Sequence, residues 1–526
     1  MGVLTSTLMP PRHWLPVVVI AGLIGGSSSG GDSSNTAASS WSPGVFEASS
    51  SFEAQCANPR SGTDPATGRA FPDRPGSTVL ENDWLRSWTH ELYLWYREVP
   101  DLNPASYATA DYFELLKTTA TTASGNPKDK FHFTYPTAQW EQLIQSGVSA
   151  GYGAQWVVIK SRPPRRVVVA YTEPHSPATT AKLARGAQVL TVDGVDLVNA
   201  GDQASIDTLN EGLFPSAAGG SHRFSILDRG ASNPRNVTMV ATDVTGTPVQ
   251  NVGTLHVPGG TVGYMLFNDH LATAEKQLIG AFGRLASARV DDLVLDLRYN
   301  GGGYLDIASE VAYMIAGPAP TTGETFERTA FNDKYPTTDP VTGAPLTPVP
   351  FHTVSQGFSG PRGVALPTLN LPRVLVLTSG NTCSASESII NGLRGVGVQV
   401  IQIGTTSCGK PYGFYPEDNC GTTYFSIEFR GLNAQGFGDY PDGFSPANTR
   451  GSRGVVVPGC SVSDDFTHAL GNPRERRLAA ALAYRIDRSC PAASAGASAD
   501  TAVPDWSAVD GVAPKSPWHE NRALRH

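Results

Sequence analysis

Between residues 262 and 486, short apolar runs alternate with segments of helical periodicity. Three of these runs, Val262–Phe267, Arg373–Thr378 and Val398–Ile403, have the length and β-branched content of buried strands. Thr273–Ala286 lies between the first two and repeats apolar residues three or four positions apart. Strands that alternate with helices usually pair in parallel, because the chain crosses over between them. The pattern predicts an α/β core with a mostly parallel sheet, inside an α+β multidomain chain.

Ser384 is predicted at a point where a strand turns into a helix. The strand Arg373–Thr378 ends at Ser379-Gly380, and residues 388–393 then carry apolar side chains at helical spacing. A helix start offers unpaired backbone N–H groups and the positive end of the helix dipole to an oxyanion. The position suits a nucleophile, although a serine there is more often a simple N-cap.

A serine hydroxyl needs a base, and Lys410 is the candidate. It follows the apolar run Val398–Ile403 and stands in a Gly409-Lys410-Pro411 turn. A lysine acts as a base only when it is neutral, which requires loss of water or a nearby positive charge. The turn suits a lysine held against the core, although most lysines are solvated.

A glycine turn completes a set of three blocks. Three successive glycines at 301–303 follow an apolar strand and let backbone N–H groups approach a ligand closely. In chain order, the segments VLDLRYNGGGYL, TSGNTCSASESI and GTTSCGKPYG resemble the signature blocks of the C-terminal processing (tail-specific) serine peptidases. This resemblance implies a βαβ-type peptidase core.

The resemblance also implies roles for individual residues. Ser384 would be the nucleophile and Lys410 its base. The oxyanion hole would use the N–H of Ala385 and that of Gly301 or Gly302. The family needs no metal and no cofactor.

Two positions leave the identity of the catalytic base open. Family members often carry a glutamine four residues after the lysine, where this chain has Phe414. Tyr412 or a backbone carbonyl could orient Lys410 instead. His132 lies where tricorn-like relatives carry a catalytic histidine, so it is an alternative base. The other interpretation is a structural histidine between two buried phenylalanines.

Residues 148–245 resemble a circularly permuted PDZ domain of the kind built into these peptidases. The segment contains several short strands flanked by glycine. Gly151, Tyr152 and Gly153 are predicted to hold the terminal carboxylate of a bound peptide, which would add as a strand. A β insert with a purely structural role is the alternative.

The sequence predicts five regions. They are a signal peptide and Gly/Ser-rich tether at 1–50, a helical subdomain at 51–147, the PDZ-like domain at 148–245, the peptidase core at 253–488 and a flexible tail at 491–526. The signal prediction depends on Arg12 before the apolar run Trp14–Ile24, which is too short to span a bilayer. Trp84, Leu85 and Trp88 recur at helical spacing and predict the helical subdomain.

Cysteine content and net charge limit which bonds and which classes of binding partner we expect. The six cysteines show no metal-ligand spacing, and in an exported chain they can form disulfides. We expect Cys408 to pair with Cys420, since they flank the loop of Lys410; buried free thiols are the alternative. A net charge of −8 gives no basic surface for nucleic acid. No integral membrane segment is expected after removal of the signal.

The sequence therefore predicts a serine endopeptidase that uses Ser384 and Lys410. It would capture unfolded or extended protein C-termini through the PDZ-like domain. Its location would be the periplasm or cell envelope, or outside the cell. Two alternatives stay open: a catalytically inactive PDZ adaptor, and a Ser–His peptidase that uses His132.

Overall fold

The computed structural model describes residues 41–491 and 522–523. The predicted signal peptide and most of the tether and tail lie outside these residues. Residues 41–50, predicted as the end of the tether, contact the helical segment that follows. Arg86 donates to the carbonyl of Val45 at 2.9 Å, and Gly44 N donates to Asp101 at 2.7 Å. None of the described helices is both long and apolar enough to cross a membrane.

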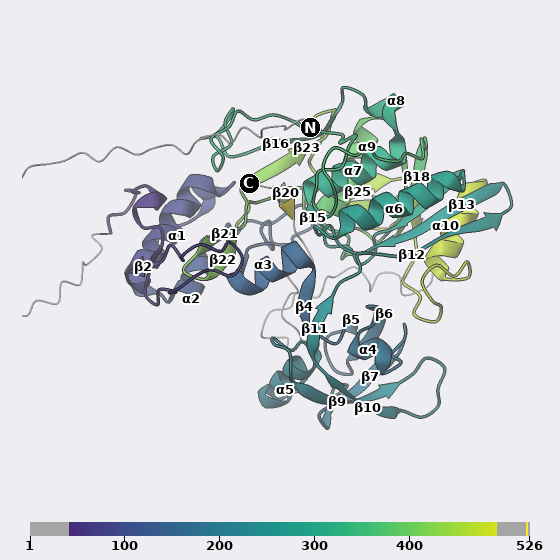
Figure 1. Cartoon of the computed structure of the whole chain (residues 1–526), viewed down its shortest axis with the longest axis horizontal. Helices are drawn as coiled ribbons and strands as arrows, with labels where there is room; N and C mark the ends of the chain where they lie inside the picture. The colour runs from purple at the N-terminus through teal and green to yellow at the C-terminus, as the bar shows by residue number, and fades with distance from the viewer. Residues whose placement is uncertain (1–40, 492–521, 524–526) are drawn as a thin grey trace, which may run out of the picture. The chain divides into compact units, whose positions relative to one another are not determined.

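A six-stranded sheet forms the centre of the core (Figure 1). Its order is β12 (Val249–Val257), β13 (Gly260–Phe267), β14 (Asp292–Asp296), β18 (Arg373–Thr378), β19 (Gln399–Gly404) and β26 (Gly459–Ser461). The pair β12–β13 is antiparallel and every other pair is parallel. The predicted mostly parallel sheet is confirmed.

Helices cover both faces of this sheet. Helices α6 (Ala274–Ser287), α7 (Leu305–Ala316) and α9 (Ala385–Gly395) pack on one face, and α10 (Arg476–Asp487) packs on the other. Within β18, Val374 and Val376 face the first group, whereas Leu375 and Leu377 face α10. A strand buried on both faces needs apolar residues at every position, which explains its unbroken apolar run.

The N-terminal region contains α-helices. They are α1 (Thr78–Leu92), α2 (Thr109–Leu115) and α3 (Thr137–Ser146). Trp84 and Trp88 stack on α1, with ring centroids 5.2 Å apart, and both contact Tyr424. Strand β3 (Phe133–Pro136) also pairs with β22 (Thr422–Phe425). The helical region is thus fixed to the segment that follows Lys410.

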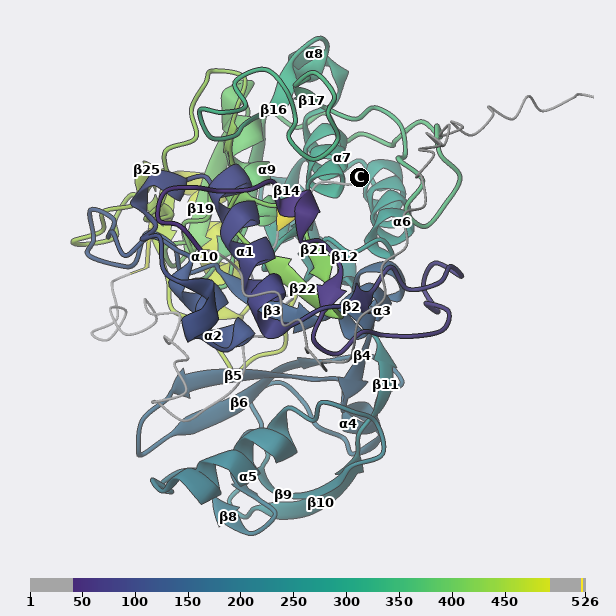
Figure 2. The ribbon, with the colours of Figure 1, turned by 90° about the vertical axis from the view of Figure 1, so that its left-hand side faces the viewer.

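The predicted PDZ-like region is a β insert with its own hydrophobic core (Figure 2). Its sheet has the order β10 (Arg235–Val240), β9 (Ser221–Leu227), β7 (Gln188–Val192), β6 (Arg166–Thr172) and β5 (Ala154–Lys160). Helices α4 (Pro177–Thr180) and α5 (Gln203–Leu213) complete it. Strands β4 (Val148–Gly151) and β11 (Thr242–Thr245) pair antiparallel where the chain enters and leaves the insert.

The remaining elements are short. They are η1 (Ser49–Ser51), η2 (Tyr96–Glu98), η3 (Pro104–Ser106), α8 (Pro318–Thr321), β1 (Gln55–Cys56), β2 (Arg74–Pro75), β8 (Val195–Asp196), β15 (Gly303–Tyr304), β16 (Thr325–Ala330), β17 (Val349–Pro350), β20 (Tyr412–Gly413), β21 (Glu417–Asn419), β23 (Phe429–Leu432), β24 (Phe444–Pro446), β25 (Val455–Val457) and β27 (Arg522–Ala523). Strand β27 pairs in parallel with β15, directly after the glycine turn.

The three disulfides differ from the predicted pairing. Cys56 bonds Cys420, Cys383 bonds Cys408, and Cys460 bonds Cys490. The expected Cys408–Cys420 bond is therefore wrong. The fold brings Cys408 next to the residue that precedes Ser384, and it brings the β21–β22 turn to the N-terminal segment. Neither of these contacts between segments could be predicted from the spacing of cysteines along the chain.

Candidate active site

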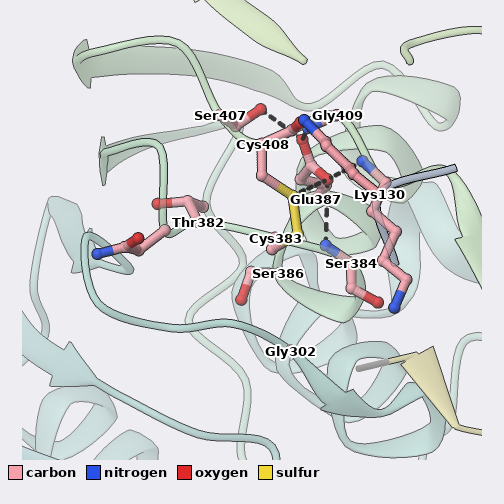
Figure 3. Close-up of a disulfide and its surroundings, with 12 residues drawn as sticks. Lys130, Gly302, Thr382, Cys383, Ser384, Ser386, Glu387, Ser407, Cys408 and Gly409 are labelled. Carbon is pink, nitrogen blue, oxygen red and sulfur yellow. Dashed lines mark hydrogen bonds between the residues drawn. A yellow bond between two sulfur atoms is a disulfide. The ribbon is translucent and has the colours of Figure 1, made fainter. Parts of the chain in front are cut away.

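Ser384 lies at the N-cap of α9, between β18 and the helix, as the sequence predicts (Figure 3). Its backbone has φ +59° and ψ −116°. A side chain at positive φ costs energy, and such strain concentrates at functional turns. Ser384 is fully buried, and its Oγ has no hydrogen-bond partner within the described part of the chain. The hydroxyl therefore lies at the start of the helix.

Asn300 joins the glycine turn to the nucleophile turn. Its carbonyl accepts hydrogen bonds from Cys383 N at 3.1 Å and Ser386 Oγ at 3.0 Å. Its side-chain Nδ2 donates to the carbonyl of Phe267 at 2.9 Å, which fixes the turn to the end of β13. The two turns therefore keep a constant separation beside the ends of parallel strands.

Two backbone N–H groups remain as candidates for an oxyanion hole. Ala385 is the first residue of α9, and the N–H of a first helical residue has no partner inside its helix. Gly302 N donates to Asn300 Oδ1 at 3.0 Å, so this N–H is already engaged. Of the two glycines that the sequence left open, Gly301 is the better candidate in this conformation.

Lys410 is completely buried, and two aromatic rings lie close to its amine. Nζ lies 4.5 Å from the ring centroid of Phe414 and 5.0 Å from that of Phe131. Phe414, which replaces the expected glutamine, is thus part of the lysine's immediate surroundings. It contributes an apolar wall in place of a hydrogen-bonding side chain.

Ser384 and Lys410 meet at one carboxylate. Glu387 Oε2 accepts from Ser384 N at 3.1 Å and from Lys410 N at 2.8 Å. The disulfide Cys383–Cys408 connects the same two segments covalently. The backbones of Ser384 and Lys410, which lie on separate segments of the chain, are therefore fixed close together.

His132 faces away from this centre. Its Nε2 lies 2.8 Å from the carbonyl of Phe113, so Nε2 carries the proton, and its ring stacks on Phe113 with centroids 3.8 Å apart. Burial lowers the pKa of His132, which keeps the imidazole neutral. Its neighbour Phe131 points to Lys410 instead. The arrangement favours the structural interpretation of His132.

The predicted peptide-binding residues line a groove of about 570 Å³. Its lining includes Gly151 to Trp156 and the run from Leu213, the last residue of α5, to Ala218. Strand β5 is at the edge of its sheet, so its outer backbone groups can pair with an added strand. Tyr152 is buried, and its hydroxyl donates to the carbonyl of Gly212 at 3.0 Å, so only its backbone can face a ligand.

Residues 261–413 match the model of Peptidase family S41. This segment is an S41 domain. It contains the glycine turn, Ser384 and Lys410, and it confirms the resemblance to C-terminal processing peptidases.

Two curated relatives are both named carboxyl-terminal-processing protease. The protein from Picosynechococcus sp. is 26% identical over 243 residues, which are 45% of this chain and 49% of the relative. The one from Synechocystis sp. is 30% identical over 139 residues, or 26% and 31% of the two chains. This chain therefore spans about half or less of the curated relatives that it matches.

A solved structure extends the comparison beyond the S41 domain. A candidate S41 protease from Bacteroides fragilis is 22% identical, with a TM-score of 0.58. The match covers 76% of this chain and 96% of that one. At this identity the similarity establishes the fold, which is the mixed α/β arrangement predicted from the sequence.

One polar cluster that no sequence pattern indicated lines the groove. Glu173, which follows β6 in the insert, accepts from Thr247 N at 2.8 Å and Gln250 Nε2 at 3.2 Å, on the segment that leads into the S41 domain. Burial raises the pKa of Glu173 to about 7. Burial and the charge of Glu173 also hold the pKa of Asp269 well above its usual range. The two carboxyl groups come from segments far apart in the chain, which only the folded structure brings together.

Proposed function

We propose that the chain is a serine endopeptidase in which Ser384 attacks the substrate carbonyl and Lys410 is the base. The single observation that carries the proposal is the convergence of both residues on Glu387, beside the glycine turn of an S41 domain. The Lys410 amine takes the hydroxyl proton as the Oγ–C bond forms. It then gives that proton to the leaving amine as the peptide C–N bond breaks.

The surroundings of Lys410 support a neutral amine. Aromatic faces favour an ammonium by about 0.5–2 kcal/mol. Complete burial disfavours a lysine ammonium by up to roughly 4–7 kcal/mol. Lys410 is fully buried, so its loss of hydration favours the neutral amine, whereas the ring faces of Phe131 and Phe414 favour the ammonium.

The first chemical step needs a hydrogen bond that Ser384 Oγ does not make to any described residue in this conformation. Catalytic hydrogen bonds often tighten only when substrate binds. We propose that rotation of the Ser384 or Lys410 side chain closes this contact in the complex. The developing oxyanion is then held by the N–H groups of Ala385 and Gly301. Loss of one such donor typically costs about 10²–10³ in rate.

The proposed substrates are unfolded or extended C-termini of exported proteins. The open edge of β5 and the glycines of the groove fit capture of a peptide terminus. Arg522–Ala523 pairs as a strand with β15, beside the glycine turn. This pairing supports the proposal that an extended substrate segment fits beside the turn. Three disulfides among the described cysteines are typical of an oxidising compartment such as the periplasm, the cell envelope or the exterior.

The test is cleavage of an unstructured polypeptide with an apolar C-terminus. Ser384→Ala and Lys410→Ala should abolish cleavage, whereas His132→Ala should retain it, because His132 faces Phe113. Cleavage by Lys410→Ala at the wild-type rate would transfer the base role to another residue. Binding without cleavage by the wild-type protein would favour an adaptor.

A further inference from the structure

A fully buried carboxylate stands between the two parts of the proposed dyad. Glu387 lies in the first turn of α9 and has no exposed surface. Its Oε1 accepts from Gly409 N at 2.9 Å and Ser407 Oγ at 2.5 Å. Its Oε2 accepts from Ser384 N at 3.1 Å (Figure 3) and from Lys410 N at 2.8 Å.

All four of these neighbours donate to the carboxyl group, which favours its ionised form. An ionised carboxylate can only accept, so it satisfies every one of them. A protonated Oε2 would turn its O–H toward backbone N–H groups, whereas a protonated Oε1 could donate only to the Ser407 hydroxyl. Burial raises the pKa of Glu387, while its four hydrogen bonds act in the opposite direction. In its ionised form Glu387 accepts from all four donors.

The donors come from both sides of the site. Ser384 N belongs to the nucleophile turn, whereas Ser407, Gly409 and Lys410 belong to the loop after β19. Hydrogen bonds to a charged acceptor are shorter and about twice as strong as neutral ones. One buried charge thus fixes the separation of two loops whose side chains must meet during reaction.

We propose that Glu387 is a positioning residue that sets the distance between Ser384 Oγ and Lys410 Nζ. The proposal depends on the proposed function, because it concerns the geometry of that dyad. Glu387 bonds backbone and Ser407 and contacts no reacting atom. Its removal should therefore reduce the rate of the chemical step and leave substrate binding almost unchanged.

The test compares Glu387→Gln with Glu310→Gln. The glutamine is isosteric, but its NH₂ faces donors, so at least one backbone N–H loses its acceptor. A misplacement of about 1 Å can cost 10²-fold, so kcat should fall about 10²-fold with KM within about twofold. Glu310 is also a buried glutamate, on α7, and accepts from Gln356 N at 2.9 Å. Glu310→Gln should keep the wild-type kcat.

A second variant covers the case in which Glu387→Gln does not fold. Ser407→Ala removes one donor and keeps the carboxylate, and kcat should fall about three- to tenfold. A wild-type kcat in Glu387→Gln would overturn the positioning role. If that variant is unfolded, a wild-type kcat in folded Ser407→Ala would do the same. Neither result would affect the proposed peptidase function. An inactive wild-type protein would instead overturn the proposed function and with it this inference.

Discussion

The proposed catalytic centre and the proposed capture groove are built in opposite ways. Ser384, Glu387 and Lys410 have no exposed surface, and a disulfide and a shared carboxylate join their segments. The groove is a space of about 570 Å³ lined in part by the first residues of β5, the edge strand of its sheet. Chemistry requires atoms at fixed distances, whereas a groove that reads backbone can accept many side chains. The difference predicts that changes at the centre affect kcat and changes at the groove affect KM.

Removal of the active-site disulfide should give the larger effect. Cys383→Ala/Cys408→Ala opens a loop of sequence separation 25, and Cys460→Ala/Cys490→Ala opens one of 30. Loops of these lengths predict a similar loss of about 3–4 kcal/mol in the free energy of unfolding. Only the first bond joins the nucleophile turn to the lysine loop, so only that variant should lose kcat, by about 10–100-fold.

Urea unfolding and steady-state kinetics on both double variants check this prediction. Equal stability losses with unequal kcat would sharpen the contrast between the two regions. A similar fall of kcat in both variants would mean that the disulfides act only through global stability.

A methyl group in the groove should give the next largest effect. In Gly153→Ala the new Cβ would lie 2.4 Å from Ser176 Cβ, at a φ of +69°. Gly194→Ala has a similar φ of +86° but no neighbour within 4 Å. Gly153→Ala should raise KM about tenfold for a substrate with a free C-terminus and keep kcat, whereas Gly194→Ala should change neither. A fall of kcat alone in Gly153→Ala would contradict the division of roles.

The smallest effect concerns the pH dependence of stability at the groove. Because burial raises the pKa of Glu173 to about 7, the folded chain keeps a proton that the unfolded chain loses near pH 4.5. The free energy of unfolding should therefore fall as the pH rises from about 4.5 to 7. Glu173→Gln should match the wild type at pH 5 and exceed its stability by up to about 3 kcal/mol at pH 8.

Urea unfolding at both pH values checks the sign, and Glu211→Gln, an exposed change on α5, is the control. Parallel pH curves for wild type and Glu173→Gln would show that Glu173 does not titrate in this range.

Local sequence predicted the parts of the centre that lie within one segment. The apolar run Arg373–Thr378 forms β18 with the expected bounds, and Ser384 stands between it and α9. The glycine turn likewise follows β14. In each case strand periodicity, a turn and a helix start are encoded by consecutive residues, so spacing along the chain was sufficient.

Contacts between segments that are distant in the chain could not be predicted from local sequence patterns. Six cysteines allow fifteen pairings, and the sequence argument chose Cys408–Cys420 where the fold forms Cys383–Cys408. The engagement of Gly302 N by Asn300 and the orientation of His132 toward Phe113 also depend on packing across elements.

By itself, the sequence determined the parallel core, the strand-to-helix turn at Ser384 and the glycine turn, because each follows from short-range periodicity and backbone freedom. Only the tertiary structure decided what surrounds Lys410, which cysteines pair and how Glu387 connects the two loops. Those features arise where side chains from separate segments exclude water together, and no local pattern specifies which segments will meet.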